Sequence, residues 1–437
     1  MKPTSHLIFS TLLGLVVACT SVTAPLYGQT MPVCDGVISD VIFTGNKVTR
    51  DRTLEQRIDL RPGSLCTAEA LANGRQAIMN TGLFQDVNVS FDEVTSQVEF
   101  TVTERHYILP LPRISRNADG EVQLGGQLRF DNVKGLGHKF KLAARREQED
   151  DGKGNGGSKA SVRYEIPRFF NSDFGATIGV SAISRTEDAF DNEVEVGIVK
   201  RRERALNLGV SRFLAPGPSL QGFRVDVGLS FVDREYTLEE GGFGTLVSGT
   251  NSELRVKLSN NQLQLDEYRR RGTQYGVVLA LAKEGVLSDF SYVRLSAFWR
   301  LYFPLVSEAY ENINVQLRLG AANRGAFGEP SFLLGGSSTL RGFPSDALQG
   351  EKMALANIEY LRSFRRRPGL RWALIMDFAA VKNDDPWNFS DLRGGVGGGF
   401  RWKIRSFVNT DLRLDIAYGL GTGGGERKVY FGTNTLF

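Results

Sequence analysis

One stretch decides the fold class: Val293-Arg294-Leu295-Ser296-Ala297-Phe298-Trp299-Arg300-Leu301-Tyr302-Phe303. Its large apolar side chains recur at every second position, while Arg294, Ser296 and Arg300 lie on the opposite face. A period of two residues is the pattern of a β-strand with one apolar face. The stretch is about ten residues long, whereas strands of soluble sheets average about five. It therefore predicts a long strand of a large antiparallel sheet.

The same alternation recurs from residue 107 to residue 437, for example at 225–231, 313–319 and 412–416. At roughly 20 residues for each strand and its connection, this length predicts about 16 strands. A soluble β-sandwich also alternates. Here, however, the polar face is rich in Arg, Asp, Glu and Gly, as in a water-filled interior. We expect a mainly β protein, with a transmembrane antiparallel β-barrel over 107–437.

Composition excludes several other classes. The 437 residues contain 53 basic and 49 acidic side chains, a net charge of +4, with only three cysteines and three histidines. No apolar run is long enough for a transmembrane helix, which needs about 18 residues. The charge is too balanced to indicate nucleic acid. There is no nucleophile elbow, phosphate loop or zinc-ligand spacing. We expect no enzyme activity, no cofactor and no metal.

The N-terminus resembles an export signal. Lys2 precedes an apolar run over 7–18, which is too short to span a bilayer and fits a signal peptide over 1–28. Alternatively the signal is 1–18 and Cys19, which follows a lipobox-like sequence, carries a lipid. Residues 29–35 are expected to be a linker. In an oxidising compartment Cys34 and Cys66 can form a disulfide; two free thiols are the alternative.

A small domain is expected over 36–106. Alternating residues at 41–43 predict a strand, and 50–59 and a segment beginning at Thr67 predict two helices. Two further alternating segments, 87–91 and 98–102, close the domain. The predicted order is β-α-α-β-β.

This domain resembles a POTRA domain. The resemblance rests on Phe43-Thr44-Gly45-Asn46 and Thr81-Gly82-Leu83-Phe84, together with the element order. It implies binding of unfolded client chains by strand addition at an exposed sheet edge. The expected edge residues are Asp86, Val87, Val89 and Phe91. A domain that only spaces or orients the barrel is the alternative.

The long segment 324–351 contains Leu340-Arg341-Gly342-Phe343 after a Gly-Gly pair. With Asn357-Ile358-Glu359-Tyr360 and Ile375-Met376-Asp377-Phe378-Ala379, it resembles the POTRA-plus-β-barrel outer-membrane assembly superfamily, which includes BamA/TamA-like assembly factors and two-partner secretion transporters. Strand parity places Glu359 and Asp377 in the lumen. A lumen Arg341 between two carboxylates would fasten the loop inside the barrel, with Gly342 allowing close approach and Phe343 packing on the wall.

The first predicted barrel strand carries Pro110 and Pro112, which cannot donate ladder hydrogen bonds. The last predicted strand contains Phe431 and ends at Phe437. These residues predict a weak lateral seam between the first and last strands. The alternative is that the prolines only end the linker.

The resemblance implies an outer-membrane β-barrel assembly factor that receives clients through the POTRA domain and inserts them at the seam. A secretion transporter of the same superfamily and a passive pore are the alternatives. The expected partners are unfolded outer-membrane or secreted polypeptides, outer-membrane lipids and periplasmic chaperones or accessory assembly proteins, with no nucleic acid. The expected location is the outer membrane of a Gram-negative-type bacterium, with the POTRA domain in the periplasm.

Overall fold

The computed structural model describes residues 34, 36–116, 122–148, 156–169, 172–191, 194–214, 221–265, 268–305, 310–383, 386–408 and 410–433. The expected signal segment, Cys19, all of the linker except Cys34, and Phe437 lie outside these residues. Among the described residues, no helix has the length and apolar character needed to cross a membrane.

The N-terminal domain contains the expected β-α-α-β-β series, with two short strands added to it. Its elements are β1 (Gly36–Val37), β2 (Asp40–Thr44), α2 (Asp51–Glu55), β3 (Leu65–Cys66), α3 (Ala68–Asn80), β4 (Phe84–Asp92) and β5 (Gln97–Glu104), of which β1 and β3 are the added strands. The main sheet has the order β2-β5-β4, with β2 parallel to β5. Helix α2 is shorter than the expected 50–59. Helix α3 begins as predicted, because the side chain of Thr67 accepts a hydrogen bond from the Ala70 N–H at 3.1 Å.

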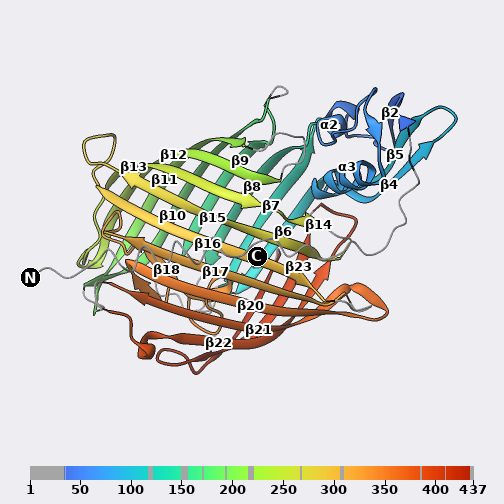
Figure 1. Ribbon diagram of the computed structural model, residues 1–437. Helices are drawn as coiled ribbons and strands as arrows, with labels where there is room; N and C mark the ends of the chain where they lie inside the picture. Colours follow the sequence, from blue (N-terminus) through green and yellow to red (C-terminus); the bar gives the residue numbers. More distant parts are fainter. Residues whose placement is uncertain are drawn as a thin grey trace, which may run out of the picture.

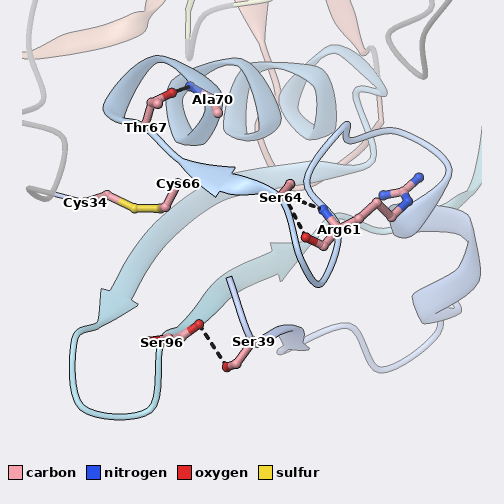
Figure 2. Close-up of a disulfide and its surroundings, with 8 residues drawn as sticks. All are labelled: Cys34, Ser39, Arg61, Ser64, Cys66, Thr67, Ala70 and Ser96. Carbon is pink, nitrogen blue, oxygen red and sulfur yellow. Dashed lines mark hydrogen bonds between the residues drawn. A yellow bond between two sulfur atoms is a disulfide. The ribbon is translucent and has the colours of Figure 1, made fainter. Parts of the chain in front are cut away.

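A disulfide joins Cys34 to Cys66, with the two Cα atoms 5.6 Å apart (Figure 2). Cys66 lies in β3, which pairs with β1 next to Cys34. The core of the domain lies between α3 and the main sheet and contains Leu71, Ile78 and Phe100, all fully buried. The domain thus has an apolar core of its own as well as a covalent crosslink.

The rest of the chain forms one antiparallel barrel (Figure 1). Within the described residues it has sixteen long strands: β6 (Ile108–Arg116), β7 (Val122–Val133), β8 (His138–Gln148), β9 (Gly157–Ile166), β10 (Phe174–Asp191), β11 (Val194–Phe213), β12 (Gly222–Gly241), β13 (Gly249–Asn261), β15 (Arg270–Ala282), β16 (Tyr292–Pro304), β17 (Asn312–Ala322), β20 (Lys352–Phe364), β21 (Arg367–Lys382), β22 (Arg393–Lys403), β23 (Asp411–Leu420) and β24 (Arg427–Thr433). The two-residue β14 (Gln264–Leu265) lies between β13 and β15.

The faces of the barrel follow the parity read from the sequence. Outward side chains such as Ile178, Leu374 and Trp402 are about half exposed, and they form an apolar outer surface. Many inward positions carry charged residues such as Glu359 and Asp377, which are buried. The alternating sequence pattern therefore reflects an apolar exterior and a polar lumen.

Strands β10 and β11 are longer than the sequence predicts. The expected strands end near residue 185 and begin again near 203, yet the ladder continues from Arg185 opposite Arg201 to Asp191 opposite Val194. On β10 the residues 185–188 are polar on both faces and hide the strand signal, whereas on β11 Val194, Val196 and Ile198 alternate with Glu195 and Gly197, a signal that the strand assignment did not use. Backbone pairing with β12 also supports the extension, up to Gly197 opposite Gly241.

The N-terminal domain lies against one end of the barrel, here called the POTRA end (Figure 1). The Thr53 hydroxyl donates to the carbonyl of Gly135, at 2.8 Å, in the turn between β7 and β8. The Gln76 side chain donates to the carbonyl of Leu265 in β14 at 3.0 Å. Both helices of the domain thus contact connections between barrel strands, and the long segment 324–351 enters the barrel from the opposite, far end.

Candidate functional site

The site is built on two neighbouring strands of the barrel wall. Glu359 and Asn357 lie on β20, and Asp377 lies on β21 directly opposite Asn357. All three side chains point inward and are at most 1% exposed. Asn357 donates to Asp377 at 2.8 Å and to the backbone carbonyl of Thr339 at 2.7 Å. The wall therefore offers two carboxylates and an amide to the loop that approaches it.

Arg341 of the loop fills this position. Its guanidinium holds Asp377 through Nε at 2.7 Å and Nη2 at 2.6 Å. Its Nη1 contacts Glu359 at 2.6 Å. The side chain is fully buried. The structure thus brings together the three charged residues selected from the sequence, in the bidentate geometry typical of arginine and carboxylate.

Three further charged residues, not selected from the sequence, complete the network. Arg401 on β22 contacts Glu359 at 2.7 Å and also pairs with Asp415 on β23. Asp415 lies 3.4 Å from Nη1 of Arg341, and Arg413 approaches Asp415 at 3.1 Å. Three arginines therefore balance three carboxylates, as burial of so many charges requires. Inward strand parity was the available signal for all three residues.

Glycines allow the loop backbone to touch the wall. A Cβ added at Gly395 would lie 2.1 Å from the carbonyl oxygen of Arg341, and one at Gly419 would lie 2.5 Å from that of Gly342. Gly342 itself has φ +91°, in the region that favours glycine. The loop therefore lies in van der Waals contact with β22 and β23.

The last strand also holds the loop. The hydroxyl of Tyr430 on β24 accepts a hydrogen bond from the Gly342 N–H at 2.9 Å and lies 3.3 Å from the carbonyl oxygen of Phe343. Phe343 is buried, in an apolar cluster with Leu340 of the loop and Leu355 of β20. No pattern in the sequence pointed to Tyr430, because its role depends on how the barrel brings β24 beside the loop.

The same loop has a second attachment, on the opposite wall. Glu329 contacts Arg234 at 2.6 Å and Arg201 at 3.1 Å, and accepts a hydrogen bond from the Tyr236 hydroxyl at 3.1 Å. The Arg234 guanidinium also stacks 4.1 Å from the ring centre of Phe327. Sequence reasoning did not select these residues. The loop is thus fastened to β11 and β12 near its beginning and to β20–β24 near Arg341.

Two of the expected seam residues, Pro110 and Pro112, lie on β6. The Asp131 N–H donates to the Tyr107 carbonyl at 3.0 Å, and these residues continue the β6–β7 register of Ile108 opposite Phe130. Because hydrogen-bonded and non-bonded pairs alternate in an antiparallel ladder, Pro110 and Pro112 direct their backbone away from β7. The neighbour on that side is β24. Both prolines lie inside the strand, so they do not simply end a linker.

No register of opposite residues is defined between β6 and β24 among the described residues, whereas each other neighbouring pair of long strands has one. Phe431 lies on β24 and is half exposed. Phe437, the other seam residue expected on the last strand, lies outside the described residues.

The expected client-binding residues lie on β4, at one edge of the N-terminal sheet. Val87 is fully buried, and its carbonyl accepts a hydrogen bond from Arg75 at 2.7 Å. Asp86 lies 3.5 Å from Arg405 of the barrel. Val89 and Phe91 are only partly buried. The unoccupied part of this edge is therefore the end that contains Val89 and Phe91.

Comparison with known proteins gives the class that this fold and lumen network define. Residues 36–105 match the family model of POTRA, surface antigen variable number repeat. Residues 132–437 match the model of the Omp85 superfamily domain. This second match covers more than half of the chain. The protein is an outer-membrane β-barrel with one POTRA domain, and it belongs to the Omp85 superfamily.

Solved structures share this fold. BamA from Haemophilus ducreyi lacking POTRA domains 1–3 is 16% identical with a TM-score of 0.56, covering 91% of this chain and 84% of that one. CdiB from Acinetobacter baumannii is 14% identical with a TM-score of 0.64, covering 91% and 73%. CdiB from Escherichia coli is 14% identical with a TM-score of 0.67, covering 92% and 76%. No curated protein sequence matches the chain.

Proposed function

We propose that this protein is a non-enzymatic factor that inserts β-barrel proteins into the outer membrane, with its POTRA domain in the periplasm. The observation that carries the proposal is the backbone of β6 on the side of β24. Pro110 and Pro112 both direct their nitrogen toward this neighbour, and neither has an N–H to donate. The strand pair is therefore short of two hydrogen bonds that a regular ladder would contain.

A client strand needs an unpaired strand edge before it enters lipid, because an unsatisfied backbone group costs several kcal/mol in hydrocarbon. Opening of the β6–β24 seam exposes such an edge. The client would be received first at the POTRA edge, by strand addition beside Val89 and Phe91. No nucleotide is required, since closure of client hydrogen bonds and burial of apolar faces supply the driving force.

The loop anchored at Glu329 and Arg341 supports this reading over a passive pore. It crosses the lumen between two walls and is held by a partly buried ion pair at Glu329 and by a fully buried one at Arg341. A pore that conducts steadily needs an open lumen. The same loop stiffens the wall formed by β20–β24. Of the two strands that form the seam, β6 is therefore easier to displace than β24.

The test combines two measurements. The protein is depleted in its native host, and the levels of folded outer-membrane barrels and of secreted proteins are quantified; the purified full chain is also placed in a planar bilayer. Loss of many barrels with low steady conductance is expected. Loss of one secreted protein with normal barrel levels would assign secretion instead. Large steady conductance with unchanged barrels would assign a pore.

A further inference from the structure

On the outer face of β8–β12, residues paired across the strands form three successive rows that differ in polarity and size. The row nearest the POTRA end is apolar and contains Leu142, Val162, Val180, Leu206 and Phe231. The next row contains Ala144, Ala160, Ala182, Arg204 and Asp233. The third contains Arg146, Ser158, Ser184, Arg202 and Glu235. Adjacent residues in each row face each other across neighbouring strands.

These rows leave a hollow on the outer surface. The central strands β9 and β10 contribute only Ala160, Ala182 and two serines to the two far rows. The larger side chains of Leu142 on one side and Phe231 on the other rise above them. The hollow is a groove of about 710 Å³ lined by these alanines and by Leu142, Val162, Val180, Leu206, Phe231 and Arg204. An acyl chain fits such a surface.

Three cations lie at or just beyond the far end of the groove: Arg204 lines it together with Asp233, and Arg146 and Arg202 lie in the next row. Arg146, Arg202 and Arg204 are exposed, and none of them makes a hydrogen bond or ion pair with another described residue. Asp233 and Glu235 lie opposite Arg204 and Arg202, but on the β12 side alone. Arg146 and Arg202 are separated by three strand spacings, about 14 Å, with serines between them. The groove therefore ends in a cationic rim with room for a phosphate.

The position of these arginines relative to the membrane follows from the outward residues of β11. Its outward residues are apolar at 206, 208 and 210, between Arg212 near the POTRA end and Arg204. The step of eight residues from Arg212 to Arg204 extends about 26 Å along the strand, which is about 20 Å along the barrel axis at a strand tilt of about 40°. The apolar band of outer-membrane barrels is of the same order, about 25 Å. Arg204 and Arg202 thus reach the membrane–water interface opposite the POTRA domain.

We propose that this groove binds a phosphorylated, multi-acyl glycolipid of the outer leaflet, of the lipid A type. An acyl chain lies over Ala160 and Ala182, and phosphate oxygens accept hydrogen bonds from Arg146, Arg202 and Arg204, whose planar groups suit phosphate. The leaflet follows from the orientation proposed above, with the POTRA domain in the periplasm. The assembly activity itself is not required for binding.

The test measures binding of diphosphoryl lipid A to the purified full chain in nanodiscs by native mass spectrometry, with phosphatidylglycerol as the competing anionic lipid. In one variant Arg146, Arg202 and Arg204 are all changed to Gln. Its affinity for lipid A is expected to fall about fivefold for each arginine that contacts phosphate. The control changes 365–367, an exposed arginine turn at the POTRA end, to Gln and is expected to bind lipid A normally.

A second variant, Ala160→Leu with Ala182→Leu, fills the groove and keeps every charge, so it tests the proposal even if the arginine variant does not fold. It is also expected to bind lipid A more weakly. Wild-type affinity in the arginine variant would overturn the proposal, as would equal loss of phosphatidylglycerol binding. A dimer abolished by the double leucine variant would assign the groove to a second copy of the chain instead.

Discussion

Asp377 accepts three hydrogen bonds from Arg341: one from the backbone N–H at 3.0 Å and two from the guanidinium at 2.7 and 2.6 Å. One carboxylate thus fixes both the side chain and the backbone of the loop at the same point. The geometry requires a planar, forked cation, and a lysine ammonium cannot reproduce it.

Arg341→Lys is therefore expected to release the loop although the charge is conserved. Removing one partner of a buried ion pair costs about 3–5 kcal/mol, because the other charges remain buried. Cleavage of 324–351 by proteinase K, mapped by mass spectrometry, should become faster. Arg324→Lys, an exposed position in the same segment, is the control and should be cleaved like the wild type. Equal cleavage of both variants would show that Arg341 does not hold the loop in place.

Gly395→Ala is expected to displace the loop without any change of charge. The new Cβ would lie 2.1 Å from the carbonyl oxygen of Arg341, an impossible approach. Gly398→Ala, on the same strand, is the matched control, since its nearest atom would be 3.4 Å away. Hydrogen exchange at residues 335–345 should rise only in the first variant. Similar exchange in the two variants would contradict the close packing described above.

Glu329→Gln tests the second attachment by itself. The change leaves Arg234 and Arg201 with one carboxylate fewer, so we expect faster hydrogen exchange at 326–331 and little change near Arg341. Glu239→Gln, at an exposed position of β12, serves as the control. If exchange rises equally around Arg341, the loop is held as one unit and the two attachments are not independent.

Pro110→Val with Pro112→Val restores two N–H donors on the side of β24. Each added hydrogen bond contributes about 1 kcal/mol, so the seam should open less readily. Insertion of an unfolded eight-stranded barrel into liposomes that contain the variant should be slower, as measured by the heat-modifiable folded fraction. Pro304→Val, at the end of β16, should insert at the normal rate. Unchanged insertion by the double variant would argue against this seam.

Cys66→Ser removes the crosslink to Cys34, which closes a segment with a sequence separation of 32. The chain-entropy relation gives a loss of roughly 3–4 kcal/mol for a loop of this size. The denaturation midpoint of the N-terminal domain should fall, while heat-modifiability of the barrel stays normal. Reduction of the wild type should reproduce the change, and reduction of Cys66→Ser should add nothing to it.

Local pattern was enough to predict several features of this protein. Alternation with period two requires only that each strand has one apolar face, so the strand count and the inward direction of Glu359 and Asp377 follow from sequence. The pattern was insufficient where both faces are polar, as at 185–188, where β10 continues beyond the strand expected from the sequence. Backbone pairing with a neighbouring strand, which carries no side-chain signature, supports that segment.

The sequence by itself determined a barrel with an apolar exterior, a POTRA domain and an arginine-bearing loop near two lumen carboxylates. Only the tertiary structure decided which distant residues meet that loop. Arg401, Asp415 and Tyr430 reach Arg341 and Gly342, and Glu329 reaches Arg234, because the wall curves and brings strands far apart in sequence to a common lumen. Contacts across a closed space depend on register and curvature, and neither is encoded in the residues of one strand.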